Sequence, residues 1–350
     1  MNGNLQHGEM RALQRVGILG GGAWGTALAQ SARRAGRDVA LWAHEFETVS
    51  EINSDHTNRV YLPGVALDPA IKATAKAKKV VDADLILLVV PSQFLRAVAK
   101  ELAPHFEAGK PVVICAKGFE ETSGTFMSGI VKEVLPEAEV AVLSGPSFAG
   151  EVARNLPTAL TLACESETLG ATLMAALAHR NFRLYWSSDV IGTQVGGTVK
   201  NVLAIAAGIV EGREFGRNAH AAVTTRGFAE LVRLGMKLGG RFETLTGLSG
   251  LGDLILTCSS IQSRNMSLGV ALGQGQALAE ILGARKSITE GVYSAGAVVA
   301  LAKKHGIEMP ICEAVHNVVK GRMSLDEAIE ALLSRPLRPE TDHRPAEAAR

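Results

Sequence analysis

The first half of the chain alternates short apolar runs with amphipathic stretches. Between Arg15 and about Ser188 the apolar runs are Val16–Gly20, Asp38–Trp42, Asp84–Val90, Pro111–Cys115, Glu139–Leu143 and Thr158–Cys164. Several are rich in Val, Ile and Leu with little alternation, which is typical of parallel strands covered by helices on both faces. Stretches of helical period lie between them, for example Trp24–Ala35 and Gln93–Phe106. This order of strand and helix predicts an α/β domain built on a doubly wound parallel sheet.

The pattern changes after Asp189, where strand-like runs almost vanish. The helical stretches there are Val190–Glu211, Ala219–Leu238, Ala277–Leu282, Gly296–His305, Ile311–Val319 and Ser324–Leu333, with a glycine-rich segment at Gly247–Gly252. We therefore predict an α/β domain over residues 15–188 and an all-helical domain over 189–335. Residues 1–14 and 336–350 are expected to form disordered ends.

Composition and charge exclude several classes of protein. Hydrophobic residues make up 47% and charged residues 20% of the 350, which excludes a disordered or collagen-like chain. The 36 Lys and Arg and the 35 Asp and Glu leave a net charge of +1, so no overall field favours nucleic acid or an acidic membrane. The N-terminus has no signal-peptide pattern, and Val202–Val210 is too short an apolar stretch for a membrane span. A cytoplasmic protein is expected.

Cysteine and histidine spacing indicates neither a disulfide framework nor a metal site. The four cysteines, Cys115, Cys164, Cys258 and Cys312, include no C-x-x-C pair and are few for this length. We expect them to be reduced and buried. The nine histidines are dispersed, with no pair at ligand spacing.

A G-x-G-x-x-G motif spans Gly20–Gly25, between a predicted strand and a predicted helix. Gly20 permits the tight turn, Gly22 lets a pyrophosphate approach the backbone, and Gly25 lets helix and strand pack closely. The helix N-terminus adds free N–H groups and a positive dipole end. In this context the motif predicts a Rossmann-like, dinucleotide-binding domain, with a purely structural glycine turn as the alternative.

The end of the second strand bears on the choice between NADH and NADPH. An NAD-selective site usually places Asp or Glu there, to bond the ribose 2′-hydroxyl. This chain has Ala43 and His44 instead, with Glu45 one position late. His44 would tolerate a 2′-phosphate better than a carboxylate would, which is consistent with NADPH and leaves NADH open. An ordinary helix-start role for His44 is the alternative.

Candidate substrate residues follow the later strands. Lys117 lies just past the carboxyl end of Pro111–Cys115, at the edge where open α/β sheets bind ligands. A solvated loop charge is its alternative. Gly145 and Ser147 hold the same position after Glu139–Leu143 and could form an edge for an oxygen-rich ligand. A plain Gly-Pro turn is the alternative.

Lys200 stands inside an otherwise apolar helical stretch. Burying a lysine is costly unless it has a partner or snorkels to the surface. Burial and nearby cations lower the pKa of a lysine toward neutrality, which suits a proton donor and acceptor. A snorkelling surface lysine is the alternative.

The glycine-rich segment leads into further polar candidates. Asp253 is a carboxylate among glycines and apolar residues, suited to orient a lysine or to bond a substrate hydroxyl. Ser263, Arg264 and Asn265 stand at an expected helix start and could cradle a phosphate. A helix–loop–helix in which Ser263 is only the N-cap is the alternative.

Together these motifs resemble the bacterial-type NAD(P)-dependent glycerol-3-phosphate dehydrogenases, from Val16 to about Leu333. The resemblance is carried by Gly20–Ala27, Ala116–Gly118, Ser144–Ala149, Val199–Asn201, Gly250–Leu254, Ser263–Asn265 and Glu290–Gly291. It implies an active site between the Rossmann-like and helical domains, with NADPH or NADH as cofactor. The implied reaction is the reversible reduction of dihydroxyacetone phosphate to sn-glycerol 3-phosphate for phospholipid synthesis. The resemblance also makes a homodimer the expected assembly.

The resemblance further implies roles for individual residues. Lys200 would be the proton donor and acceptor. The substrate would contact Lys117, Gly145, Ser147, Lys200, Asp253, Ser263, Arg264 and Asn265. The cofactor would contact Gly20, Gly22, Ala23, Trp24, Gly25, His44, Tyr61, Lys117, Ala149, Arg264, Ile288 and Glu290. Ala23 replaces a serine often found in the family, so one side-chain bond to the cofactor is in doubt.

Two rival functions stay open on the sequence. A 3-hydroxyacid or 6-phosphogluconate-type dehydrogenase pairs similar domains and also uses a lysine, but Ser263–Asn265 after Gly-Leu-Gly-Asp argues against it. A non-catalytic dinucleotide sensor would need the Gly20–Gly25 loop and no buried lysine. Lys117, Lys200 and Asp253 argue against the sensor.

Overall fold

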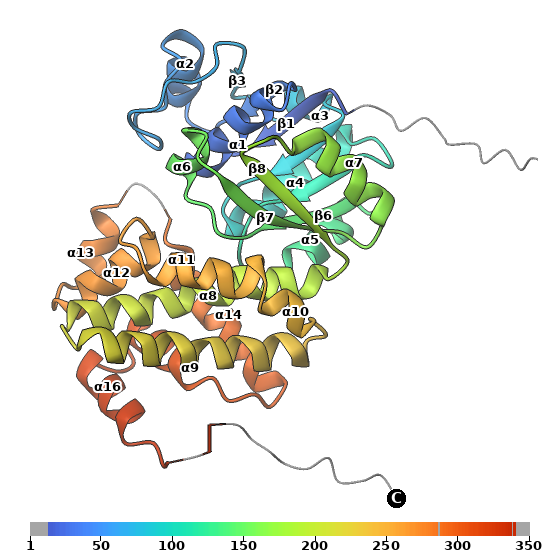
Figure 1. Ribbon diagram of the computed structural model, residues 1–350. Helices are drawn as coiled ribbons and strands as arrows, with labels where there is room; N and C mark the ends of the chain where they lie inside the picture. The colour runs from blue at the N-terminus through green and yellow to red at the C-terminus, as the bar shows by residue number, and fades with distance from the viewer. Residues whose placement is uncertain (1–12, 286–287, 338, 341–350) are drawn as a thin grey trace, which may run out of the picture.

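One sheet dominates the α/β half of the protein. The computed structural model describes residues 13–285, 288–337 and 339–340, with the α/β half in the upper part of Figure 1 and the helical half below it. The sheet has eight strands in the order β3-β2-β1-β4-β5-β6-β7-β8. They are β1 (Arg15–Leu19), β2 (Asp38–Trp42), β3 (Lys72–Thr74), β4 (Leu85–Leu88), β5 (Pro111–Ile114), β6 (Glu139–Ser144), β7 (Thr158–Ala163) and β8 (Phe182–Ser187).

Each of the six predicted apolar runs corresponds to one strand, and the predicted doubly wound parallel sheet is confirmed except for one pairing. β7 is antiparallel to β6, with Val142 opposite Ala163, while every other pairing is parallel. A parallel neighbour needs a crossover to the opposite edge of the sheet. The short helix α6 (Ala149–Ala153) stays near the edge where β6 ends, so β7 starts there and runs back.

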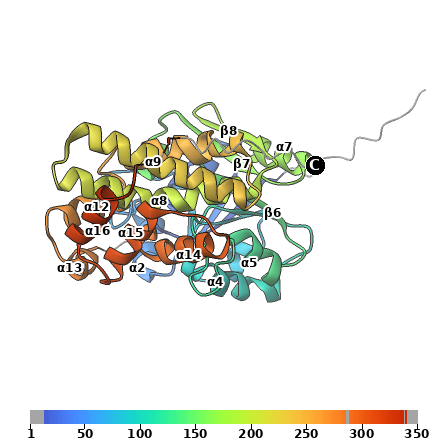
Figure 2. The same cartoon turned by 90° about the horizontal axis from the view of Figure 1, so that it is seen from below.

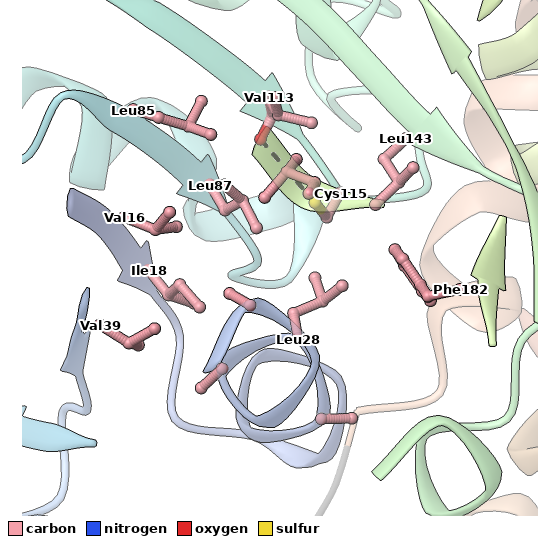
Figure 3. Packing of buried hydrophobic residues seen from close by; sticks show 14 of the residues in the cluster. Val16, Ile18, Leu28, Val39, Leu85, Leu87, Val113, Cys115, Leu143 and Phe182 are labelled. Atoms are coloured by element: carbon pink, nitrogen blue, oxygen red, sulfur yellow. Dashed lines mark hydrogen bonds between the residues drawn. The ribbon is translucent and has the colours of Figure 1, made fainter. Parts of the chain in front are cut away.

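Helices cover both faces of this sheet, as the doubly wound prediction requires. One hydrophobic cluster combines Val16 and Ile18 of β1 with Leu28 (Figure 3), and the other combines Leu19 with Leu95. The helices of this half are α1 (Ala23–Arg34), α2 (Phe46–Ser54), α3 (Lys78–Val81), α4 (Leu95–Leu102), α5 (Met127–Val134), α6 and α7 (Glu167–Leu177), with short 3-10 turns η1 (Ser92–Phe94) and η2 (Ala103–His105).

The folded α/β half begins before β1. Leu13 is 6% exposed in the hydrophobic cluster, and the Gln14 N–H donates to the Asp84 carboxylate at 3.1 Å. These two residues therefore belong to the folded domain rather than to the predicted disordered end. The rest of that end, residues 1–12, and residues 338 and 341–350 of the predicted tail lie outside the described residues.

The second half is helical, as predicted, with no strand among its described residues. Its helices are α8 (Val190–Gly212), α9 (Gly216–Lys237), α10 (Phe242–Leu245), α11 (Asp253–Cys258), α12 (Arg264–Gly273), α13 (Leu278–Gly283), α14 (Glu290–Lys304), α15 (Pro310–Val319) and α16 (Leu325–Leu333). The glycine-rich segment forms a π-helical turn, η3 (Leu248–Gly252). All six predicted helical stretches are present, and α10 and α11 were not predicted.

Helix α8 is the central element of the helical half. Every residue from Gly192 to Ile209 is buried, and α9 runs beside α8 in both views (Figures 1 and 2). α12 packs closely on α8, because a Cβ on Gly208 would lie only 2.1 Å from the Met266 carbonyl oxygen. α8 is long and apolar enough to cross a membrane by length and composition alone. However, 83% of its 18-residue apolar window is buried inside the protein, where it forms the core of this half.

All four cysteines are free and buried, as predicted. Burial raises the pKa of the Cys258 thiol to about 12. The thiols are therefore protonated at neutral pH and act as small apolar side chains.

Candidate active site

The glycine loop after β1 has the geometry of a dinucleotide-binding turn. Gly20 has a φ of +130°, and a Cβ on Gly25 would lie 1.8 Å from the Gly20 carbonyl oxygen. A Cβ on Gly22 would instead meet nothing within 4 Å. Gly22 is the N-cap of α1 without a side-chain cap, so the first N–H groups of α1 lack a side-chain acceptor. This open helix N-terminus fits the pyrophosphate of NAD(P).

Ala23 and Trp24 form the first turn of α1, where both are half-buried. The Trp24 indole N–H is buried and has no hydrogen-bond partner among the described residues. A buried donor of this kind is costly unless a ligand or water supplies an acceptor. The donors that this loop offers to a bound phosphate are therefore the backbone N–H groups of the first turn of α1.

Two predicted cofactor-side residues, His44 and Tyr61, lie near the carboxyl end of β2. His44 is exposed, with its ring edge-on to Trp42 at 6.2 Å between centroids. The Tyr61 hydroxyl donates to the Glu45 carboxylate at 3.1 Å, and burial together with this carboxylate raises the pKa of Tyr61. The structure therefore brings His44 and Tyr61 to one region and gives Glu45 a partner there.

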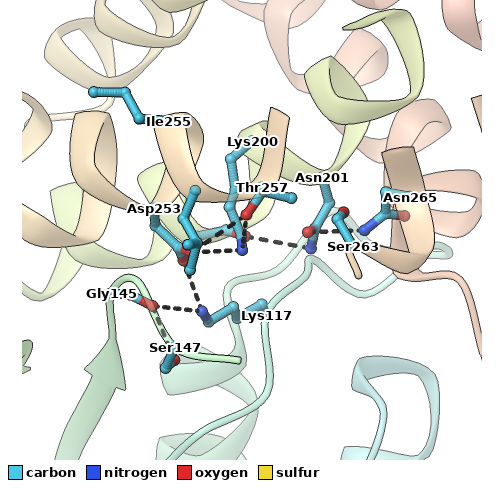
Figure 4. A network of polar contacts seen from close by, with 12 residues as sticks. Lys117, Gly145, Ser147, Lys200, Asn201, Asp253, Ile255, Thr257, Ser263 and Asn265 are labelled. Carbon is cyan, nitrogen blue, oxygen red and sulfur yellow. Dashed lines mark hydrogen bonds and ion pairs between the residues drawn. The ribbon is translucent and has the colours of Figure 1, made fainter. Parts of the chain in front are cut away.

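A buried carboxylate joins two lysines at the edge where β5 and β6 end (Figure 4). Asp253 accepts from Lys117 Nζ on one oxygen and from Lys200 Nζ on the other, both at 2.7 Å. Lys200 also donates to the Thr257 hydroxyl at 2.7 Å. Lys117 follows β5, Lys200 lies in the middle of α8, and Asp253 begins α11 directly after the π-helical turn. Both halves of the protein contribute to this network.

The burial of Lys200 distinguishes a buried, paired lysine from a snorkelling surface lysine. Its side chain is 9% exposed and that of Asp253 is 1% exposed, so Lys200 does not snorkel to the surface. Burial and the Lys117 charge lower the pKa of Lys200 to about 8, while Asp253 opposes the shift. A lysine with this pKa can both hold and release a proton near neutral pH.

This pKa predicts opposite pH dependences for the two directions of a reaction that uses Lys200. Ketone reduction needs the ammonium, so kcat/KM should fall about tenfold per pH unit above about pH 8. Alcohol oxidation needs the neutral amine and should level off above the same pH. Initial rates from pH 6.5 to 10 test this. A reduction rate that stays constant to pH 10 would contradict it.

Gly145 and Ser147 lie beside Lys117 (Figure 4). The Gly145 carbonyl oxygen accepts from Lys117 Nζ at 3.3 Å and from the Ser147 hydroxyl at 3.0 Å. Gly145 has a φ of +145°, and a Cβ there would lie 2.9 Å from the Leu160 side chain. The turn after β6 is thereby fixed against the Lys117 side chain.

The N-terminus of α12 has the N-cap that the sequence offered as the alternative to a phosphate cradle. Ser263 is its N-cap, accepting from the Met266 N–H at 3.2 Å, and Arg264 is the first helical residue. Arg264 is exposed by surface area, but desolvation by the atoms that surround it lowers the pKa of its guanidinium, and the neighbouring Glu290 carboxylate opposes that shift. Capping does not exclude anion binding here, because a helix N-terminus leaves further N–H groups unpaired.

Asn265 is more deeply engaged in the fold than the phosphate-cradle prediction assumed. Its amide nitrogen donates to the Asn201 side chain and its amide oxygen accepts from the Gly291 N–H, both at 2.9 Å. Its side chain therefore ties α8, α12 and α14 together. The second hydrogen of that amide nitrogen, the second lone pair of the amide oxygen and the backbone N–H are left for a substrate.

The remaining cofactor-side predictions come from both halves of the protein. Ala149 is half-buried and begins α6, which packs on α1. Ile288 is half-buried and precedes α14. Glu290 begins α14 and accepts from the Ser92 N–H at 3.3 Å and hydroxyl at 2.8 Å. Among the described residues, no group of three or more His, Cys, Asp or Glu could hold a metal ion.

Comparison with known proteins follows the same division into halves. The pattern of the NAD-dependent glycerol-3-phosphate dehydrogenase N-terminus matches residues 15–170, and that of its C-terminus matches residues 189–330. A glycerol-3-phosphate dehydrogenase [NAD(P)+] of Parvibaculum lavamentivorans is 58% identical over 330 residues, covering 94% of this chain and 99% of the relative. This chain belongs to the NAD-dependent glycerol-3-phosphate dehydrogenase family.

Solved structures of the glycerol-3-phosphate dehydrogenase family share the fold. The crystal structure of glycerol-3-phosphate dehydrogenase from Coxiella burnetii has a TM-score of 0.89 at 40% identity, covering 92% of this chain and 99% of that chain. The enzyme from Saccharomyces cerevisiae has a TM-score of 0.78 at 26% identity, covering 93% and 100%. A ketopantoate reductase from Ralstonia eutropha, at 20% identity and a TM-score of 0.60, shares the fold alone.

Sequence reasoning missed Ser92, and it considered the Thr257 hydroxyl only as part of a phosphate cradle, whereas the structure bonds it to Lys200. Thr257 lies four residues after Asp253 on α11, so helical spacing could have placed its hydroxyl beside that carboxylate. Ser92 lies 198 residues before Glu290, and no local signal connects them. Its contact depends on how the two halves pack together.

Proposed function

We propose that this chain catalyses the reversible NAD(P)H-dependent reduction of dihydroxyacetone phosphate to sn-glycerol 3-phosphate. This product would supply glycerophospholipid synthesis. The observation that carries the proposal is the buried Asp253 carboxylate between the Lys117 and Lys200 ammonium groups. It supports Lys200 as the acid/base group, because this network lies at the edge of the sheet that also carries the Gly20–Gly25 loop. The names of the relatives support the same substrate.

The residues around the glycine loop fit a nicotinamide dinucleotide. Gly20, Gly22 and the first turn of α1 would hold the pyrophosphate, and His44 and Tyr61 would lie on the adenosine side. Ala149, Ile288 and Glu290 would complete the cofactor contacts, together with Lys117 and Arg264. The bound NADPH or NADH would supply the hydride for C2 of the ketone.

Lys200 and its neighbours would handle the charge that develops on the ketone oxygen. In the reducing direction the Lys200 ammonium donates a proton to that oxygen. Lys117 adds positive charge that stabilises the oxyanion in the buried cleft. Asp253 fixes both ammonium groups, so their orientation is set before the substrate arrives. In the oxidising direction neutral Lys200 accepts the hydroxyl proton of the substrate.

The N-terminus of α12 would bind the substrate phosphate. The Arg264 side chain and the free N–H groups of the first turn supply charge and donors, and Ser263 retains its hydroxyl hydrogen after capping the helix. Gly145 and Ser147 would line the opposite side beside Lys117. Phosphate binding at one end would orient the carbonyl toward Lys200 at the other.

Replacing Arg264 by alanine should raise the KM for dihydroxyacetone phosphate by about ten- to a hundredfold, since a charge-assisted bond is lost. The Kd for NADPH should stay within a few-fold. Arg285→Ala is the matched control, because Arg285 bonds the Arg264 carbonyl oxygen without joining the cradle. Steady-state kinetics and NADPH fluorescence titration separate the two effects. A large loss of cofactor affinity alone would place Arg264 on the cofactor side.

The direct test of the proposed function is loss of NADPH or NADH absorbance with dihydroxyacetone phosphate. Turnover with either cofactor supports the proposal, and the ratio of the two rates tests the role of His44. Absence of turnover in protein that binds the cofactor would overturn the assignment of this substrate. A cytoplasmic location, expected from the sequence, and a homodimer, expected from the family resemblance, are further parts of the proposal.

A further inference from the structure

Ser92 joins the two halves of the protein through its contact with Glu290. It lies four residues beyond the end of β4 and is 2% exposed. Its segment packs under the glycine loop, because a Cβ on Gly20 would lie 2.8 Å from the Val89 carbonyl and 3.1 Å from the Val90 nitrogen. A displacement of Ser92 would therefore also displace the backbone that packs against the dinucleotide loop.

Both oxygens of the Glu290 carboxylate are held by Ser92. The Ser92 N–H donates to Oε1 at 3.3 Å and its hydroxyl donates to Oε2 at 2.8 Å. The direction of the hydroxyl is fixed, since the Ser92 oxygen accepts from the Gln93 side-chain amide at 3.2 Å. Its single hydrogen is thus left for Glu290. The two bonds therefore fix the orientation of the Glu290 carboxylate, which interacts electrostatically with Arg264.

Ser92 is also fitted against the loop that carries Lys117. A Cβ on Gly118 would lie 2.4 Å from the Ser92 hydroxyl oxygen and 2.6 Å from its Cβ. The Gln93 amide reaches the Phe119 carbonyl oxygen at 3.5 Å. Ser92 therefore lies between the loop after β5, in the α/β half, and the start of α14, in the helical half.

We propose that Ser92 is a positioning residue for the cofactor: it holds Glu290 of the helical half beside the segment that packs under the dinucleotide loop. This rests on the proposed function of the cleft as a nicotinamide site. Ser92 touches neither Lys200 nor Asp253 in any hydrogen bond of the described residues, so it acts on cofactor affinity rather than on proton transfer. Burial raises the pKa of Glu290, and the two Ser92 bonds and Arg264 oppose this by stabilising the carboxylate.

The test is Ser92→Ala, with NADPH binding and turnover measured separately. The Kd and KM for NADPH should rise about tenfold, while kcat at saturating NADPH stays within about twofold. Ser128→Ala is the matched control. Ser128 of α5 also bonds across the halves, to Gln194 of α8, but through a neutral amide. It should cost thermal stability without changing the Kd for NADPH.

A double-variant cycle separates this role from general stability. Glu290→Gln should also raise the Kd, and adding Ser92→Ala to it should have almost no further effect. An unchanged Kd in Ser92→Ala, an equal rise in Ser128→Ala, or additive effects with Glu290→Gln would each overturn the proposal. The binding titration needs no turnover, so failure of the proposed substrate would be seen separately in the wild-type assay.

Discussion

Replacement of Lys200 by alanine should reduce turnover of dihydroxyacetone phosphate by about 10²–10⁴-fold, the usual contribution of a positioned acid. The substrate would lose its proton donor, while the Gly20–Gly25 loop and Arg264 would remain in place. The Kd for NADPH should therefore change little. Single-turnover and steady-state rates at saturating substrate measure the loss.

Two further variants make this result specific to proton transfer. Lys200→Met keeps most of the buried side-chain volume and should lose as much activity as alanine. Lys110→Met is the matched control. Lys110 is another buried lysine (7% exposed) that bonds the Val81 carbonyl oxygen. It directly precedes β5, whereas Lys117 follows this strand at its opposite end. The Lys110→Met variant should keep near-normal turnover. Partial recovery of Lys200→Ala by added methylamine would support the role, and near-normal turnover in folded Lys200→Ala would refute it.

Asp253→Asn should have the second largest effect, with turnover reduced by about a hundredfold or more. Two ammonium groups would then share the cleft without their carboxylate, and removing one partner of a buried ion pair costs about 3–5 kcal/mol. Burial and the Lys117 charge already lower the pKa of Lys200, and Asp253 is what opposes them. Its loss should move the fall in the reduction rate from about pH 8 to a lower pH.

Glu230→Gln provides a matched control for the loss of a buried carboxylate. Glu230 is 1% exposed in the same helical half and accepts from the N–H groups of Ile311 and Cys312 at 2.7 and 3.1 Å. Its replacement should alter the melting temperature and leave the pH profile of turnover unchanged. A pH profile of Asp253→Asn identical to wild type would show that Asp253 does not set the protonation of Lys200.

The alternation of apolar runs was sufficient to predict most of the fold. It did not predict that β7 runs antiparallel to β6, because the apolar content of a strand does not encode the direction of that strand in the sheet. It missed β8 because Phe182–Ser187 lies at the sheet edge and alternates buried with exposed residues. Leu13 was assigned to the disordered end because a single apolar residue carries no periodicity.

The candidate site was predictable where one residue type contradicts its surroundings. Lys200 in an apolar helix and Asp253 among glycines are such cases, and the structure pairs them at 2.7 Å. The sequence allowed Asp253 either to orient a lysine or to bond a substrate hydroxyl. Its bonds to Lys117 and Lys200 favour the first role. The internal bonds of Asn265 and the Ser92–Glu290 contact could not be predicted, since both depend on elements that meet only in the folded protein.

The most direct test of the central claim is deuterium transfer. The protein would be incubated in ordinary water with dihydroxyacetone phosphate and NADPH deuterated at both C4 positions, and the product examined by mass spectrometry and NMR. The account predicts sn-glycerol 3-phosphate with one deuterium on C2 and a solvent-derived hydroxyl proton, formed at least about a hundredfold more slowly by Lys200→Ala. Absence of this product, or a product without deuterium at C2, would contradict it.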